Sequence, residues 1–135
     1  MVKLKKGKPK QGKHVSTNEP PNYNKSPVKF SLEKIQTGRY CFSELDQSNK
    51  ACFADSIFKR KNITWDDINK SGRHKLGTEK IPKDQIKAPV PRFITDEIDS
   101  FLVFRYNGHA PMVGYREKDI FYVLWFDSNF TLYPH

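Results

Sequence analysis

The C-terminal third of the chain has the hydrophobic pattern of a β-sheet. Its aromatic and β-branched residues fall in four short runs, and turn signals at 107–108, 117–119 and 127–129 separate them. Short runs of this kind between tight turns are typical of neighbouring antiparallel strands. The pattern therefore predicts a meander of about four strands, at 101–106, 111–116, 120–126 and 130–133.

Two helices are predicted ahead of this sheet. Within 46–61, basic residues at 59–61 complement the negative end of a helix dipole. The apolar positions that recur there at helical spacing are Ala51, Ala54, Ile57 and Phe58. A shorter helix follows Thr64, a good N-cap, with acidic residues in its first turn and Gly72 as its stop. Two helices that cover one face of an antiparallel meander define the α+β class.

The N-terminal part of the chain is basic and lacks large apolar residues. Residues 28–35 alternate apolar and polar side chains, which predicts a strand or an extended lead-in. The first 30 residues hold eight Lys and a single acidic residue, while the rest of the chain contributes only +2 to the net charge of +9. We predict a disordered basic arm over 1–27 and one α+β domain over 28–135.

A basic arm of this kind favours partners that carry negative charge. Its lysines are candidate RNA contacts, namely Lys5, Lys6, Lys8 and Lys10. The alternative is a solubilising tail. The longest apolar run, 120–126, is far shorter than the roughly 20 residues of a membrane-spanning helix, so no membrane partner is expected. Cys41 and Cys52 lack CxxC spacing and no apolar targeting segment is visible, which predicts reduced core thiols in a cytoplasmic protein.

Residues 73–91 hold three prolines and no clean periodicity, which predicts an ordered connecting loop with at most one short strand or turn. Many ionisable side chains gather at its start: Arg73, His74, Lys75, Glu79 and Lys80. Such a group either binds phosphate or transfers protons, because loops on a rigid scaffold often carry function. The alternative is a solvated charged loop.

Arg105 and Arg116 lie on neighbouring predicted strands, beside Tyr106 and Tyr115 respectively. Successive strand residues point to opposite faces, so each Arg lies on the face opposite its own Tyr. Arginine matches phosphate and aromatic rings stack on bases, which indicates an RNA-binding surface. Cross-strand ion pairs with acidic residues are the alternative.

The segment FTLYPH places Tyr133 and His135 directly after the last predicted strand. Histidine titrates near neutral pH and acts as an acid or a base, and tyrosine orients a phosphate or stacks on a base. The alternative is a frayed end of the chain. No cofactor is indicated, because phosphate-binding glycine motifs are absent, and no metal is indicated, because the histidines show no paired spacing.

This layout resembles the RelE superfamily of bacterial toxins, particularly the YoeB and HigB type of mRNA interferase, over about residues 46–135. GTEKI resembles the family's loop before the sheet, FRYNGHAPMVGYR its arginine-bearing strands, and IFYVLWFDSNFTLYPH its closing strand and tail. The resemblance implies an antitoxin partner and an RNA substrate that is bound to the ribosome in some members.

The resemblance also implies roles for individual residues. Glu79 would be the general base, Lys80 would contact phosphate, and either Arg105 or Arg116 would stabilise the transition state. Tyr133 and His135 would supply the stacking group and the terminal acid. These residues should then meet at one end of the sheet.

The resulting hypothesis is a metal-independent mRNA endoribonuclease of a toxin-antitoxin or mobile-element system. Two alternatives stay open. One is a non-enzymatic nucleic-acid-binding or adaptor protein that uses the basic arm, and the other is a small structural domain whose polar loop has no chemical role.

Overall fold

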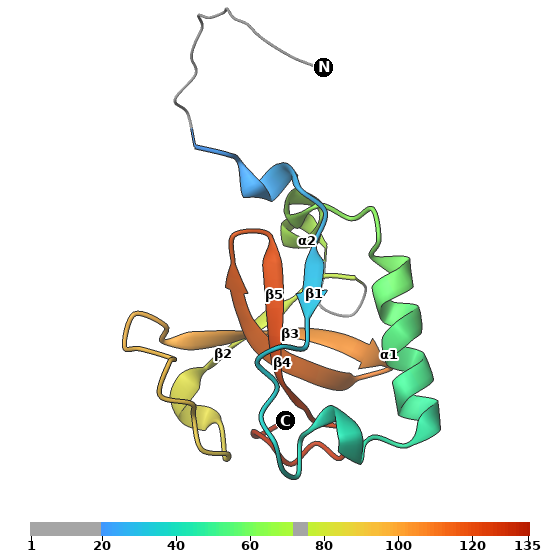
Figure 1. The fold of residues 1–135 in the computed structure, drawn as a ribbon, viewed down its shortest axis with the longest axis vertical. Helices are drawn as coiled ribbons and strands as arrows, with labels where there is room; N and C mark the ends of the chain where they lie inside the picture. Colours follow the sequence, from blue (N-terminus) through green and yellow to red (C-terminus); the bar gives the residue numbers. More distant parts are fainter. Residues whose placement is uncertain (1–19, 72–75) are drawn as a thin grey trace, which may run out of the picture.

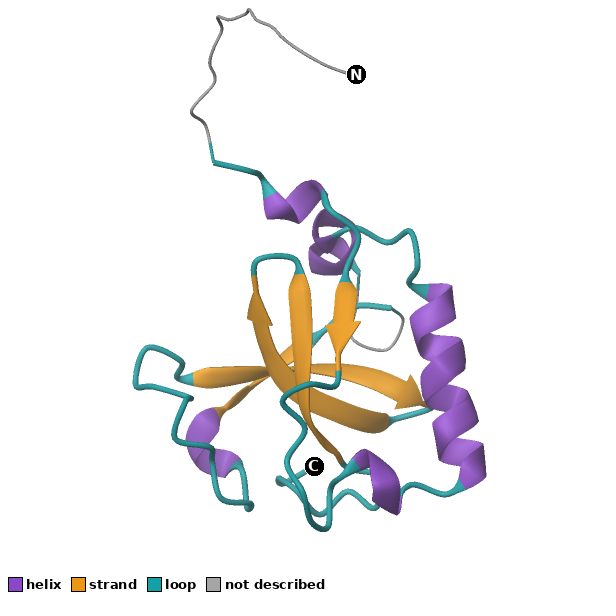
Figure 2. Cartoon of the chain, in the orientation of Figure 1, coloured by secondary structure: helices purple, strands orange, loops and turns teal. Residues whose placement is uncertain are grey.

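A five-stranded mixed sheet forms the centre of the α+β fold (Figures 1 and 2). The computed structural model describes residues 20–71 and 76–135. The strands are β1 (Lys29–Ser31), β2 (Glu79–Pro82), β3 (Ser100–Asn107), β4 (Ala110–Glu117) and β5 (Ile120–Phe126). Their order in the sheet is β1-β5-β4-β3-β2, and β1 runs parallel to β5 while all other neighbours are antiparallel.

The three central strands, β3 to β5, confirm the predicted meander up to residue 126. Tight turns join them, with Gly108 at φ 56° and Lys118 at φ 60° in the left-handed region that such hairpin turns use. At Gly114 the register of β4 against β5 shifts, and a Cβ there would overlap the carbonyl oxygen of Tyr122. Only glycine fits this close approach of two strands.

The predicted fourth strand at 130–133 is wrong. Phe130 has φ 59°, which ends the extended chain, and the Asp127 carboxylate accepts hydrogen bonds from the amides of Thr131 and Leu132. A side chain thus takes the amide hydrogens that a strand would have given to a neighbour. The edges of the sheet are instead β1, which forms within the predicted lead-in, and β2, which forms within the predicted loop.

The two predicted helices are α1 (Gln47–Lys59) and the much shorter α2 (Trp65–Lys70). The N-cap of α1 is Asp46, which accepts from the Asn49 amide at 2.8 Å. Thr64 and Asp67 form a reciprocal capping box at the start of α2. The 3-10 helices η2 (Tyr23–Lys25), η3 (Phe42–Glu44) and η4 (Lys83–Gln85) complete the elements of the described ranges.

The buried face of α1 differs from the prediction. Phe53, Ser56 and the C-cap residue Arg60 face β3, whereas Ala51, Ala54 and Phe58 are exposed. Positions 53, 56 and 60 form one stripe at helical spacing, and a Phe on that stripe buries far more apolar area than an Ala. The large side chain therefore decides which face packs against the sheet.

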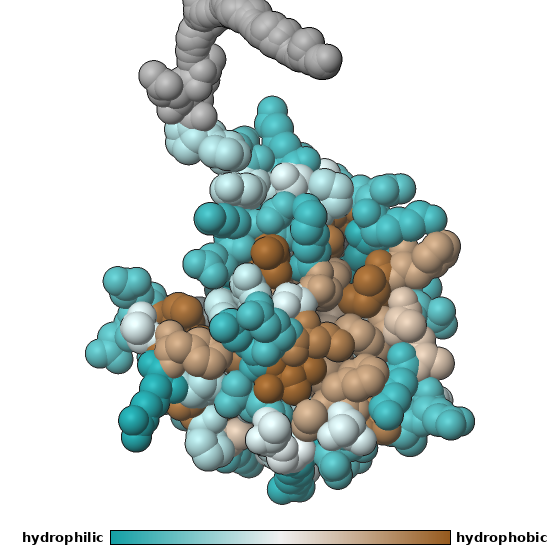
Figure 3. All heavy atoms as spheres, in the orientation of Figure 1, coloured by the Kyte–Doolittle hydropathy of each residue, from teal (hydrophilic) through white to brown (hydrophobic). Residues whose placement is uncertain are grey.

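Two cores lie on the two faces of the sheet. On the helix face, the core contains Phe104, Tyr106, Met112, Phe121 and Phe126, packed with Phe53, Trp65 and Ile68. On the loop face, it contains Phe101, Val103, Val113, Leu124 and Trp125, packed with Ile94, Leu132 and Tyr133. Both tryptophans are buried, Trp65 in the helix-face core and Trp125 in the loop-face core. In Figure 3, hydrophobic surface is visible between β1 and α1, where partly buried residues cover the helix-face core.

The folded body begins earlier than predicted. Within the segment assigned to the arm, Pro27 forms a β-bridge with Thr64, and Asn24 accepts a hydrogen bond from Arg116 at 2.7 Å. Cys41 and Cys52 are free thiols, but each is half-buried and belongs to neither core. Among the helices of residues 20–71 and 76–135, none has the length and apolar character needed to cross a membrane.

Candidate functional site

Glu79 and Arg105 form an ion pair on the loop face of the sheet. Glu79 lies opposite Val103 in the register of β2 and β3, so Arg105 is two residues further along the same face. Arg105 Nη2 donates to Glu79 Oε1 at 2.7 Å, and both side chains are less than one fifth exposed. Alternation along two paired strands thus brings a carboxylate and a guanidinium together, 26 positions apart in the sequence.

His109, in the turn between β3 and β4, contacts the same guanidinium. Arg105 Nη1 lies 2.9 Å from His109 Nδ1. Because a guanidinium only donates, Nδ1 accepts, and the ring hydrogen of neutral His109 lies on Nε2. The imidazole therefore helps to fix the orientation of Arg105.

The tail after β5 is folded around a buried carboxylate. Asp127 has no exposed side-chain area, and it accepts from the amides of Thr131 at 2.8 Å and Leu132 at 3.0 Å. Its Oδ2 atom also lies 3.1 Å from His135 Nε2. One side chain thus orders the tail and holds its histidine, so His135 is not a frayed end.

The bond to Asp127 assigns the tautomer of His135. An ionised carboxylate only accepts, so Nε2 of His135 carries a hydrogen and Nδ1 is the nitrogen that gains or loses a proton. The ring is further held by Tyr133, whose centroid lies 4.1 Å away, and by the edge-on ring of Phe130 at 5.1 Å. His135 keeps 28% of its side-chain area exposed.

These groups meet at one pocket. A cavity of about 300 Å³ is lined by Glu79, Ile81, Arg105, Tyr133, Pro134 and His135. The structure therefore brings together four of the five predicted catalytic residues, from β2, β3 and the tail. A carboxylate, a fixed cation and an oriented imidazole around one cavity have the composition of an acid-base site for phosphate chemistry.

Arg116 and Lys80 lie elsewhere. The Arg116 guanidinium is on the helix face, 4.2 Å from the Trp65 ring centroid, and bonds to Asn24 and to the carbonyl of Lys118. Lys80 is exposed and follows Glu79 in β2, so its side chain leaves the opposite face of the sheet. Both line a separate cavity of about 260 Å³.

The remaining predicted contacts lie outside the described residues. These are Arg73, His74 and Lys75 in the loop and Lys5, Lys6, Lys8 and Lys10 in the arm. Two residues of the site were missed by the sequence reasoning, Asp127 and His109. Asp127 belongs to a turn signal that was interpreted only as a turn, and His109 directly follows another. Their partners, His135 and Arg105, are only eight and four residues away in the sequence, so the spacing of these pairs was the available signal.

No protein-family model, no curated protein sequence and no solved structure matches the chain significantly. In the part of the chain that the structure describes, no group of three or more His, Cys, Asp or Glu side chains is suited to hold a metal ion. We therefore infer function from the arrangement of side chains around the pocket.

Proposed function

We propose that this chain is an RNA endonuclease that cleaves by attack of a 2'-hydroxyl on the adjacent phosphorus. The observation that carries the proposal is the single cavity of about 300 Å³ at which Glu79, Arg105 and the Asp127-bound His135 meet. Internal attack in RNA requires a base, an acid and stabilisation of charge on the phosphate, and each of these side chains supplies one of them.

Glu79 is the proposed general base. Its carboxylate takes the proton of the 2'-hydroxyl as the bond between O2' and phosphorus forms. Arg105, which is held by Glu79 at 2.7 Å and by His109 at 2.9 Å, is positioned to stabilise the charge that develops on the phosphate oxygens. The ion pair keeps the base and the cation at a fixed separation before substrate binds.

His135 is the proposed general acid. Its doubly protonated ring donates the Nδ1 proton to O5' as the bond between phosphorus and O5' breaks, while Nε2 stays bonded to Asp127. The products are a 2',3'-cyclic phosphate and a 5'-hydroxyl. Asp127 is a positioning residue, and Tyr133 supports the imidazole from its other side.

A toxin of RelE-like arrangement is the biological role that this chemistry favours. An antitoxin that blocks the pocket and a ribosome-bound mRNA substrate are part of the same proposal. The rival role, nucleic-acid binding without cleavage, depends on an arm that lies outside the described residues.

The test is cleavage of a 5'-labelled RNA in EDTA, with and without ribosomes, followed by analysis of the new ends. We expect cyclic phosphate and 5'-hydroxyl termini, unchanged by EDTA because every proton transfer is assigned to a side chain. A single 2'-deoxy substitution at the cleaved position should abolish cleavage there.

Glu79→Gln and His135→Gln should each slow cleavage by about 10²-fold or more, the usual contribution of a general acid or base. Arg116→Gln, on the other face of the sheet, is the matched control and should cleave as the wild type does. Binding of RNA without any cleavage, under both conditions, would overturn the nuclease proposal in favour of the rival role.

A further inference from the structure

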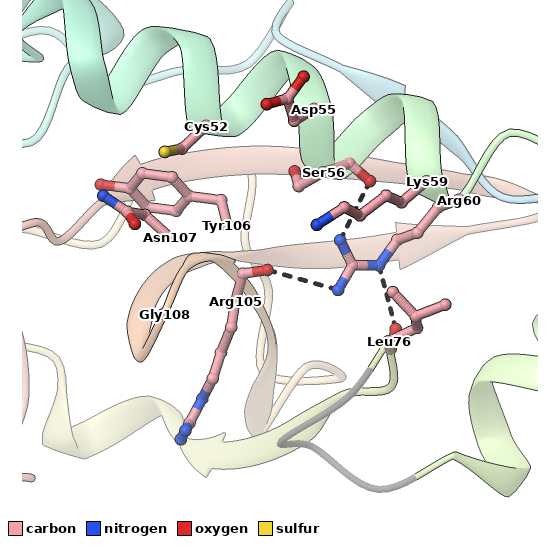
Figure 4. A pocket seen from close by; sticks show the side chains of 10 residues that line it. All are labelled: Cys52, Asp55, Ser56, Lys59, Arg60, Leu76, Arg105, Tyr106, Asn107 and Gly108. Carbon is pink, nitrogen blue, oxygen red and sulfur yellow. Dashed lines mark hydrogen bonds between the residues drawn. The ribbon is translucent and has the colours of Figure 1, made fainter.

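A second cavity lies between α1 and the end of β3 (Figure 4). Its volume is about 240 Å³, and its lining includes Ser56, Lys59, Arg60, Leu76 and the start of the β3–β4 turn. Pockets for whole small molecules usually begin at about 300 Å³. This cavity therefore suits one charged group of a larger ligand whose remainder lies outside.

The floor of this cavity is positively charged. Arg60 is only 2% exposed, and burial lowers its pKa to about 10. Its guanidinium donates to three backbone carbonyls, those of Ser56, Leu76 and Arg105. These carbonyls and the Phe104 ring, whose centroid lies 5.0 Å away, stabilise the guanidinium without a formal negative charge, and no carboxylate of the described residues lies within ion-pair distance of Arg60.

Lys59 adds a second cation to the same cavity. In Figure 4 its amino group and the Arg60 guanidinium both project from α1 into the space beside β3. Asp55 also lines the cavity, but it forms no ion pair with either residue. Two neighbouring cations repel each other unless an anion lies between them.

The cavity is linked to the proposed active site through Arg105. The Arg105 carbonyl accepts from Arg60 at 3.4 Å, while its side chain leads away from α1 to Glu79 (Figure 4). The two cavities thus lie on the two sides of one strand residue. A polymer with a charge at every unit can occupy both, which favours an RNA strand over an isolated anion or an acidic protein segment.

We propose that the cavity between α1 and β3 binds a phosphate group of the RNA strand next to the one that is cleaved. This inference rests on the proposed function for the identity of the polymer. The exposed Lys59 contacts the neighbouring phosphate, the buried charge of Arg60 attracts it, and Arg105 receives the scissile one. Anchoring one phosphate fixes the register of the next, which is how phosphate contacts position a nucleic acid.

The test measures binding of a fluorescent 2'-O-methyl RNA oligonucleotide by anisotropy, over a series of salt concentrations. This RNA lacks the attacking hydroxyl, so the full chain binds it without cleavage. The variants are Lys59→Gln, inside the cavity, and Lys61→Gln, at the same end of α1 but outside its lining. Both remove one positive charge, so non-specific attraction changes equally in the two.

We expect Lys59→Gln to weaken binding about 10-fold at low salt and to lower the slope of log affinity against log salt by about 0.7, the value for one phosphate contact on a single strand. Lys61→Gln should change affinity less than about 2-fold. Asp55→Asn removes the one acidic group of the lining and should tighten binding. Melting temperatures of all variants establish that they are folded.

Equal losses in Lys59→Gln and Lys61→Gln would overturn the proposed phosphate site, even if the wild type cleaves RNA as proposed. Competition by a glutamate-rich peptide at a much lower concentration than unlabelled 2'-O-methyl RNA requires would overturn it in favour of an acidic protein partner. Selective loss in Lys59→Gln without any RNA cleavage by the wild type would support the phosphate site while the nuclease proposal fails.

Discussion

Two dipeptides of the central hairpin, Arg105-Tyr106 on β3 and Tyr115-Arg116 on β4, have the same composition and opposite surroundings. Arg105 lies on the loop face with a carboxylate, an imidazole and a cavity around it. Arg116 lies on the helix face, over the Trp65 ring and bonded to Asn24 and a backbone carbonyl. The strand face, and not the residue type, separates a candidate catalytic arginine from a structural one.

The partners of the two arginines explain this difference. Burial lowers the pKa of Arg116, and the nearby Asp119 and Asp66 carboxylates oppose that shift, but neither forms an ion pair with it within the described residues. Its guanidinium joins η2, α2 and the β4–β5 turn. Arg105 instead joins β2 and the β3–β4 turn beside a cavity, with Glu79 as its ion-pair partner.

The largest contrast is expected in catalysis. Arg105→Ala removes the cation that stabilises the transition state and should slow RNA cleavage by about 10²- to 10³-fold. Arg116→Ala should leave the rate within roughly 3-fold, because its guanidinium lies on the other face. Single-turnover rates at saturating enzyme make the comparison, and equal losses in the two variants would contradict it.

The next largest effect on cleavage is expected from Asp127, which holds the tail. In Asp127→Asn one carboxylate oxygen becomes an NH2 group that only donates, so at least one of the three groups held by Asp127, the amides of Thr131 and Leu132 and the His135 ring, loses its acceptor. Cleavage should slow by about 10²-fold and the pH dependence of the rate should change, because the acid is wrongly oriented. Ser128→Ala, next to it in the turn, is the control. A loss of melting temperature with an unchanged pH profile would reduce Asp127 to a purely structural role.

Tyr106, the neighbour of Arg105 on β3, is buried in the helix-face core, and the stability of the protein at alkaline pH should report this burial. Burial raises its pKa to about 12, with a smaller contribution from Asp127, so the folded chain keeps the phenol proton after the unfolded chain has lost it near pH 10. Stability should therefore fall by roughly 2–3 kcal/mol from this group between about pH 10 and 12.

Tyr106→Phe should lose this alkaline destabilisation and should change stability little at pH 7, since the buried hydroxyl makes no hydrogen bond of good geometry within the described residues, although Ser128 lies close enough to lower its pKa slightly. Urea unfolding at several pH values measures the difference. Tyr115→Phe, whose partly buried phenol has a pKa raised by burial and by Glu117, should show a weaker effect. An identical alkaline loss in wild type and Tyr106→Phe would contradict this account.

Arg116→Lys tests how much the contacts of the Arg116 guanidinium contribute to stability. Lysine keeps the charge but loses the planar contact with Trp65 and the two-sided bonding to Asn24 and Lys118. We expect a loss of about 0.5–2 kcal/mol in the free energy of unfolding, the range for a cation-π contact. Urea unfolding at pH 7 is the measurement, and no change would mean that packing and the hydrogen bond from Trp65 Nε1 to the Asp119 carbonyl hold Trp65 without help from Arg116.

The smallest effect is expected at Lys80, which the resemblance assigned to phosphate. Its side chain is exposed on the face opposite Glu79, so Lys80→Ala should change the cleavage rate less than about 2-fold and stability by less than about 0.5 kcal/mol. A rate loss comparable to that of Arg105→Ala would show that substrate wraps around the edge strand.

Local patterns predicted the fold class and the central strands, because strand alternation, turn residues and helix caps are properties of neighbours in the sequence. The caps at Asp46 and Thr64 and the turns at Gly108 and Lys118 are of this kind. The predicted end of the sheet was wrong because the aromatic and apolar residues at 130–133 have a strand-like pattern, which does not show that the Asp127 side chain, four and five residues earlier, accepts hydrogen bonds from the amides of Thr131 and Leu132.

The residue types of the site could be predicted from the sequence, but which of these residues lie together in the fold could be predicted only in part. Glu79, Arg105, Tyr133 and His135 line one cavity, but their chemistry alone did not decide between Arg105 and Arg116. That choice depends on strand register, including the shift at Arg105 to Asn107. The role of Asp127 was not predicted, because its contact with His135 forms only when the tail folds back onto it.

The most direct test of the acid-base assignment compares RNA cleavage by the wild type, Glu79→Gln and His135→Gln on two substrates, one with the natural 5'-oxygen leaving group and one with sulfur in its place. A thiolate leaves without a proton from a general acid, so His135→Gln should cleave the natural substrate about 10²-fold more slowly than the wild type and the sulfur substrate at nearly the wild-type rate. Glu79→Gln should be slow on both substrates, because each still needs a base at the 2'-hydroxyl. Equal losses of His135→Gln on the two substrates would show that His135 does not protonate the leaving group, and would contradict the proposed site.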